Sequence, residues 1–218
     1  MVRYAFDESL ESLNLDLVRM ASAVEKSIDQ SILALKNKDI DLAKKVVEED
    51  DIIDDMNAEI EAKCIKLIAT QQPLAKDLRL ITSILKMITD LERIADQSAD
   101  ISELMLKIKE ENYIKPLIDV PKAADVAREM VKEAIDAYVN KDIELAKEVC
   151  KKDEIVDEYY ETILKDLQEL MRKNPDYIGQ GVILIQVAKY IERISDHATN
   201  LAEWVIYIIT GKHETLNI

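Results

Sequence analysis

The chain has 218 residues, of which 48 % are hydrophobic and 33 % charged, which is enough for one or two domains with a real core. Its formal net charge of −15 repels phosphate backbones and anionic lipid heads, so the composition argues against direct binding to nucleic acid or membranes and favours cations or a basic partner surface. With 3 glycines and 4 prolines, tight turns and Gly-rich phosphate loops are scarce and long helices are favoured.

Apolar residues recur with helical periodicity along nearly the whole chain. The pattern predicts six long helices at 7–36, 39–70, 74–110, 121–139, 142–173 and 176–210. Pro73 and Pro175 favour helix starts, and Gly211 favours a helix end. The stretch 112–121 contains two prolines and loses the periodicity, which indicates a linker.

The sequence repeats itself. Residues 37–44 resemble 140–147, and 91–96 resemble 191–196, with an offset of 103 residues early and 100 late. We therefore expect an all-α fold of two pseudo-symmetric three-helix bundles packed side by side. The predicted divisions are a first repeat at 1–111, a linker at 112–121 and a second repeat at 122–218.

The predicted location is the cytoplasm. The N-terminus lacks the apolar core of a signal peptide, and the most apolar run, 204–209, is far shorter than the roughly 20 residues of a membrane span. Cys64 and Cys150 have no CxxC spacing and are expected to be packed thiols.

Four pairs of carboxylates recur at i,i+4 spacing, at matched places in the two repeats. They are Asp50 and Asp54, Glu92 and Asp96, Asp153 and Asp157, and Glu192 and Asp196. Residues four apart lie above one another on a helix, and the helical angles place these pairs beside the apolar seam, on an acidic stripe that includes Glu203. If the second and third helices of each repeat are neighbours, the pairs converge into oxygen-rich clusters that suit Mg²⁺, Ca²⁺, Mn²⁺ or iron.

The alternative is a solvated acidic face with ion pairs to Arg93 and Arg193. Asp100 and its counterpart Asn200 extend the stripe as less secure candidates, and His197 is more simply a packed or solvent-facing side chain. The Glu-x-x-His motif of di-iron bundles is absent, which disfavours redox chemistry. The sequence also has no nucleophile triad, Walker loop or GxGxxG motif, so we expect no enzyme.

Three stretches carry a resemblance to a known protein family: 190–203, YIERISDHATNLAE, in the second half, and 71–79, QQPLAKDLR, and 90–96, DLERIAD, in the first half. On these residues the chain resembles the PhoU family. The stretch in the second half is similar to the signature of that family's last helix, and the two in the first half are similar to its first signature. The second half lacks a clear Asp-Leu-Arg after Pro175, so the two halves are open to differences in metal content or partner contacts.

The resemblance implies two three-helix bundles and an accessory protein of phosphate-specific ABC transport that limits uptake. It implies an ATPase subunit of the transporter and a phosphate-sensing histidine kinase as partners, and a homodimer. It also implies that the four carboxylate pairs bind divalent or trivalent metal ions such as iron, Zn, Mg, Mn or Ca. A metal-dependent phosphohydrolase, and a regulator of a different phosphate or cation permease, are the alternatives.

Overall fold

The computed structural model describes residues 2–108 and 112–213, with side chains from Phe6 onward. Within these residues the chain forms six α-helices and one 3-10 helix, and no strand. The elements are α1 (Val2–Asn37), α2 (Ile40–Gln71), α3 (Ala75–Leu106), α4 (Asp119–Asn140), α5 (Ile143–Lys173), η1 (Pro175–Tyr177) and α6 (Ile178–Thr210). The predicted all-α class is confirmed.

Several predicted helix ends were wrong by a few residues. Helix α1 begins at Val2 rather than 7, and α3 ends at Leu106, whereas the predicted end at 110 lies outside the described residues. Helix α4 begins at Asp119, inside the predicted linker, because Pro121 needs no backbone partner in a first helical turn. The predicted start at 176 is a 3-10 turn, which Asn174 caps by accepting a hydrogen bond from the backbone N–H of Asp176.

The two repeats make the same turn between their first and second helices. Asp39 and Asp142 cap α2 and α5, and each accepts a backbone hydrogen bond at 3.0 Å from the residue three positions on. Before each cap, Lys38 and Lys141 adopt left-handed backbone angles, with φ of 53° and 55°. The repeat seen in the sequence is therefore also a repeat of local structure.

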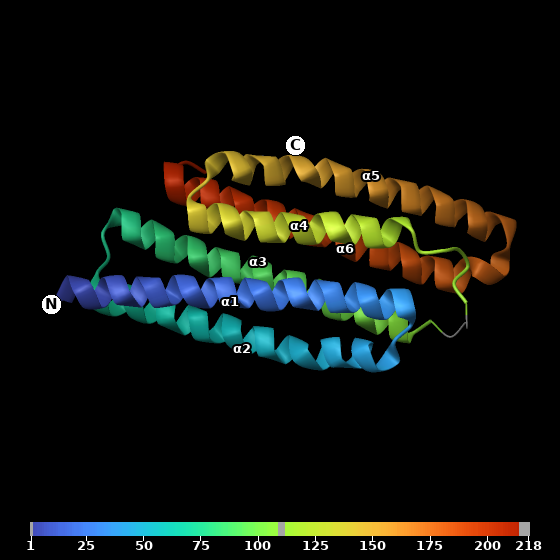
Figure 1. Ribbon diagram of the computed structural model, residues 1–218, viewed down its shortest axis with the longest axis horizontal. Coiled ribbons are helices and arrows are strands. Elements are labelled where there is room, and N and C mark those ends of the chain that lie inside the picture. The colour runs from blue at the N-terminus through green and yellow to red at the C-terminus, as the bar shows by residue number, and fades with distance from the viewer. Residues whose placement is uncertain (1, 109–111, 214–218) are drawn as a thin grey trace.

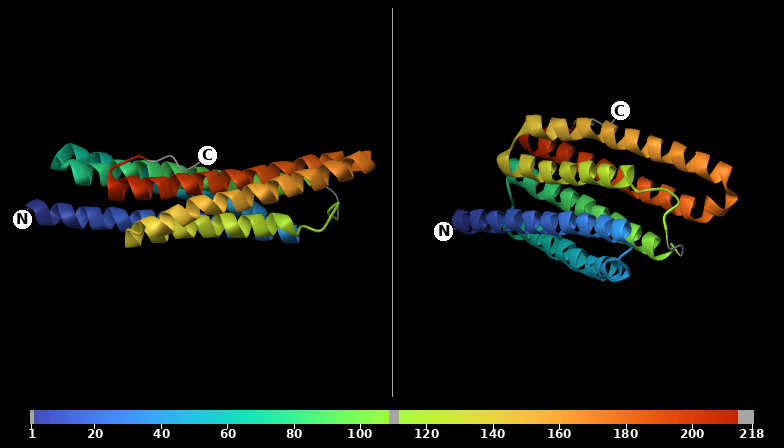
Figure 2. Two further views of the ribbon diagram at one scale, coloured as in Figure 1. Left: turned by 90° about the horizontal axis from the view of Figure 1, so that it is seen from above. Right: turned by 45° about the vertical axis from the view of Figure 1, so that its right-hand side comes forward.

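The helices pack in two layers. Helices α1 and α4 lie side by side over α3 and α6, and α2 and α5 flank the molecule on opposite edges (Figure 1). The left view in Figure 2 sees the two layers edge-on, with α1 and α4 on one side and α3 and α6, which pack against each other, on the other side. The connection between the halves lies at one end of the molecule, opposite the N-terminus (Figure 1).

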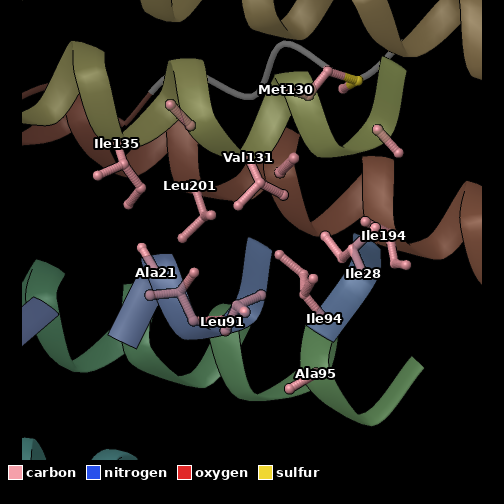
Figure 3. Packing of buried hydrophobic residues seen from close by; sticks show 14 of the residues in the cluster. Ala21, Ile28, Leu91, Ile94, Ala95, Met130, Val131, Ile135, Ile194 and Leu201 are labelled. Atoms are coloured by element: carbon pink, nitrogen blue, oxygen red, sulfur yellow. The ribbon is translucent and has the colours of Figure 1, made fainter. Parts of the chain in front are cut away.

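One apolar core joins the two halves. Side chains from α1, α3, α4 and α6 point toward one another between the layers, including Ile28, Leu91, Val131 and Leu201 (Figure 3). All four are at most 1 % exposed, so the central helices bury apolar surface on both sides of the molecule's midline. This shared burial holds the two predicted bundles side by side.

A polar clamp lies beside this core. Asp90 of α3 faces three donors from α6: His197 Nδ1 at 2.9 Å, Asn200 Nδ2 at 3.1 Å and Trp204 Nε1 at 3.2 Å. In the second repeat the residue equivalent to Asp90 is Tyr190 of α6, and its hydroxyl donates to Asp100 of α3, the residue equivalent to Asn200. The two contacts are related by the repeat, and together they fix the register of α3 against α6.

Among the described helices, none combines the length and the apolar character that crossing a bilayer requires.

The clamp yields a stability prediction. Replacing Asp90 with Ala leaves three donors without their shared carboxylate, and we expect the free energy of unfolding to fall by about 2 kcal/mol. Chemical denaturation measures it. As a control, Asp136→Ala removes a half-exposed ion pair with Lys132 and should cost less than about 0.5 kcal/mol. Equal losses in the two variants would contradict the clamp.

Candidate metal centre

The predicted carboxylate pairs come together in two clusters, because α2 packs along α3 and α5 packs along α6. We call them the first cluster (Asp50, Asp54, Glu92 and Asp96) and the second cluster (Asp153, Asp157, Glu192 and Asp196). In each, two carboxylates come from the middle of the outer helix and two from the central helix. Buried apolar neighbours on the same helices, such as Ile53 and Val156, hold these faces together.

The first cluster has the more compact geometry. Asp54, Glu92 and Asp96 each offer a carboxylate oxygen, and these three atoms all lie within 4.8 Å of one another. Arg93, three residues earlier on the same helix, donates to Asp96, with its Nη1 2.8 Å from Asp96 Oδ2. This confirms the ion pair that the sequence suggested for Arg93.

Asp50 lies deepest in the first cluster. Burial, together with the negative charges of Asp96 and Asp54, raises the pKa of Asp50 to about 6. Its Oδ1 atom is buried and accepts no hydrogen bond from the described residues. Burial also raises the pKa of Asp54 and of Glu92, so the site holds its negative charge at a cost.

Asp153 is the counterpart of Asp50 in the second cluster. Burial raises its pKa to about 6, with Asp196 and Asp157 acting in the same direction and a hydrogen bond from Ser195 acting against them. Its Oδ1 atom is likewise buried without a hydrogen bond from the described residues. Burial raises the pKa of Asp157 and Asp196 as well.

The second cluster contains its own cation. Lys189 Nζ lies 2.5 Å from Glu192 Oε1, and its charge opposes the rise in the pKa of Asp157 and Asp196. The counterpart of Lys189 in the first half is Thr89, which bonds back to the Leu85 carbonyl instead. Lys189 therefore forms an ion pair with Glu192, whereas the equivalent Glu92 of the first half has no lysine at that position.

The other residues predicted along the acidic stripe lie elsewhere. Asn200 donates to Asp90 in the clamp, and His197 contacts the same carboxylate. Asp100 accepts from Tyr190 across the same interface, and burial raises its pKa. Glu203 was predicted on the open stripe, but it is only 8 % exposed, because the packing of α5 on α6 covers it.

Sequence reasoning missed two residues that shape this region. Asp90 stands two positions before Glu92 in the quoted motif, but its partners lie more than one hundred residues away. Lys189 is three positions before Glu192, and this i,i+3 spacing to a carboxylate was the available signal.

The chemistry of these sites is set by their donors. Each cluster presents carboxylate oxygens alone, without a thiolate or an imidazole, among the described residues that form it. Hard or intermediate cations prefer such ligands, and a bound cation would relieve both the mutual repulsion and the orphaned oxygens of Asp50 and Asp153. The residues therefore fit the metal ions that the sequence predicted, and the metal itself stays a prediction.

Comparison with known proteins gives a consistent result. The family model described as PhoU domain matches residues 17–105 and 120–205. A relative from Clostridium acetobutylicum, named phosphate-specific transport system accessory protein PhoU homolog, is 40 % identical over 218 residues and 100 % of both chains. One of the same name from Pseudomonas aeruginosa is 37 % identical over 94 % of this chain and 86 % of its own.

Two crystal structures share the fold. PhoU from Pseudomonas aeruginosa superposes with a TM-score of 0.91 at 36 % identity, covering 95 % of this chain and 100 % of that one. The phosphate transport system regulatory protein PhoU from Streptococcus pneumoniae gives a TM-score of 0.90 at 27 % identity, covering 96 % and 99 %.

The raised pKa values predict how pH affects the metal-free protein. Because the folded-state pKa of Asp50 and Asp153 lies near 6, above the usual 3.8, both groups destabilise the fold when charged and cease to do so once protonated. In chelator, Asp50→Asn and Asp153→Asn should therefore each be more stable than wild type at pH 7. The gap should close as the pH falls from 7 to 4.

Denaturant unfolding across this pH range measures the effect, with the exposed Glu59→Gln of α2 as the control that shows no such gap. If wild type and both Asn variants have the same free energy of unfolding at pH 7, the charged carboxylates do not destabilise the fold.

Proposed function

This chain belongs to the PhoU family, and from that premise we propose that it is a non-enzymatic cytoplasmic regulator of phosphate uptake and phosphate-responsive signalling. The names of its relatives support an accessory role in phosphate-specific transport. The observation that carries the mechanism is the pair of carboxylate clusters, placed alike in both halves. The predicted homodimer stays a prediction of the resemblance.

We propose that the clusters bind divalent or trivalent metal ions. In the first cluster Asp54, Glu92 and Asp96 would supply ligand oxygens, with Asp50 behind them. In the second, Asp153, Asp157 and Asp196 would supply ligand oxygens, since the charges of Asp157 and Asp196 already act on Asp153, while Lys189 forms an ion pair with Glu192. A bound cation would supply positive charge that pins each outer helix to its central helix.

The proposed partners are the ATPase subunit of a phosphate transporter and a phosphate-sensing histidine kinase. A net charge of −15 favours docking on basic surfaces, and a metal bound at the two clusters would change the charge that such a partner meets. In this scheme the helical scaffold positions the clusters and the acidic faces, and the chain carries out no bond-making step of its own.

Metal binding is tested by titration of the chelator-treated protein. We expect the double variant Glu92→Ala, Asp96→Ala to abolish metal binding at the first cluster. The double variant Glu192→Ala, Asp196→Ala should weaken metal binding at the second cluster at least tenfold. The reason is the same in both, because each double variant removes ligands from one cluster. Calorimetric titration with Fe³⁺, Zn²⁺, Mn²⁺, Mg²⁺ and Ca²⁺, each used separately, measures the affinity at both clusters. Metal analysis of the protein as purified shows which ion it carries.

Lys189→Thr provides the matched control, since it copies Thr89 of the first half and frees Glu192. It should tighten metal binding at the second cluster and leave the first unchanged. Binding that survives in a variant lacking all four of the mutated carboxylates would refute the proposed sites.

The regulatory role is tested by co-purification with the transporter ATPase and the kinase at high and low phosphate. We expect association at high phosphate, weakened in the carboxylate variants, because the metal-loaded faces form the docking surface. Turnover of phosphoanhydrides that is lost in the same variants would instead favour a phosphohydrolase. Association with a different permease, or none with either partner, would overturn the proposed target.

A further inference from the structure

A cavity of about 400 Å³ lies at the end of the molecule where α1, α3, α4 and α6 meet, away from both carboxylate clusters. Its walls are apolar, with Leu80, Val205 and Ile208 on the central helices. Leu15 and Val139 at its mouth are 54 % and 57 % exposed. Solvent therefore reaches a hollow of apolar side chains.

The repeat shows what fills the corresponding place in the other half. There the connection between α3 and α4 folds back, and the Tyr113 hydroxyl donates to the Leu35 carbonyl. The ammonium of Lys38 lies 4.3 Å from the centre of the Tyr113 ring. Gln180 binds the connection's backbone, accepting from the Ile114 N–H at 2.7 Å and donating to the Asn112 carbonyl at 3.3 Å.

The residues that hold the connection have counterparts at the cavity. By the offsets of the repeat, Leu35 corresponds to Tyr138, Lys38 to Lys141 and Gln180 to Leu80. Tyr138, Lys141 and Leu80 all line the cavity. In the first half, the Tyr113 ring thus lies under Lys38. In the second half, a cavity lies at the equivalent place beside Lys141, and no equivalent of the Tyr113 connection fills it within the described residues.

The chain's own course explains why this seat is open. Helix α1 runs past the cavity as one unbroken helix, and Asn14 of α1 accepts a hydrogen bond from the Tyr138 hydroxyl at 2.5 Å at its edge. After α6 the chain turns to another side, where His213 packs 4.9 Å from the ring of Trp204 and 5.5 Å from that of Tyr207. Neither neighbouring segment enters the cavity within the described residues.

We propose that this cavity is a docking site for a peptide segment of a partner protein, whose aromatic side chain enters beneath Lys141 as Tyr113 lies beneath Lys38. A buried aromatic anchor at an apolar hollow is a common centre of binding energy. Glu11 and Lys141 at the rim offset each other in charge, so the anchor is uncharged. The site extends the proposed regulatory role to a second surface, and it does not depend on metal.

The test uses the capped peptide of residues 112–117, NYIKPL, as probe, and the same peptide with Ser in place of Tyr. Methyl NMR of the full chain should show saturable shifts at Val205, Ile208 and Ile209 with the Tyr peptide. The Ser peptide should bind at least tenfold more weakly. Leu80→Gln, which restores the amide of Gln180, should tighten binding several-fold.

Val139→Trp should fill the mouth and weaken binding at least tenfold, whereas Ile65→Trp, at a similarly exposed position of α2, should leave it unchanged. Equal binding of the two peptides, no effect of Val139→Trp, or no saturable shift would overturn the proposal. So would self-association that Val139→Trp abolishes, because a second copy would then cover the site. Metal titration of Val139→Trp should match wild type, which separates this result from failure of the metal sites.

Discussion

The rest of the structure depends on the lengthwise packing of α3 against α6. Leu91 and Leu201 bury the apolar side of this contact, and Asp90 and Tyr190 fix its register with polar partners on the opposite helix. Because the two contacts repeat with the same offset, the halves meet as near copies related by a pseudo-twofold axis. Each outer helix then docks on its own central helix, which places the two carboxylate clusters at matching positions.

In each cluster the fold brings carboxylates together although their negative charges repel one another. Like charges four apart on a helix cost a few tenths of a kcal/mol per pair, and burial adds to that cost, as the raised pKa of Asp50 and Asp153 shows. The apolar faces of α2 and α5 offset the repulsion, so the fold tolerates groups that it does not need for stability. Such local conflicts between charge and burial are typical of functional sites.

The two halves differ where duplication alone would make them alike. Lys189 places an ammonium beside Glu192, where the first half has Thr89. At the ends of the molecule, the connection that carries Tyr113 fills one seat, while the straight α1 leaves its counterpart open. A duplicated scaffold thus presents two unequal carboxylate clusters and one apolar cavity, which gives the proposed regulator distinct surfaces for distinct contacts.

The sequence by itself determined the helices, the repeat and the four carboxylate pairs, because helical periodicity, caps and i,i+4 spacing are local properties of the chain. It placed most helix ends within a few residues, but it did not show that the connection before α4 is held by the Leu35 carbonyl and the Gln180 side chain. Tertiary structure alone decided that Asp90 binds three donors of α6, that Glu203 is covered and that a cavity opens beside Lys141. These features join residues up to roughly two hundred positions apart, and their contacts arise only when the helices pack.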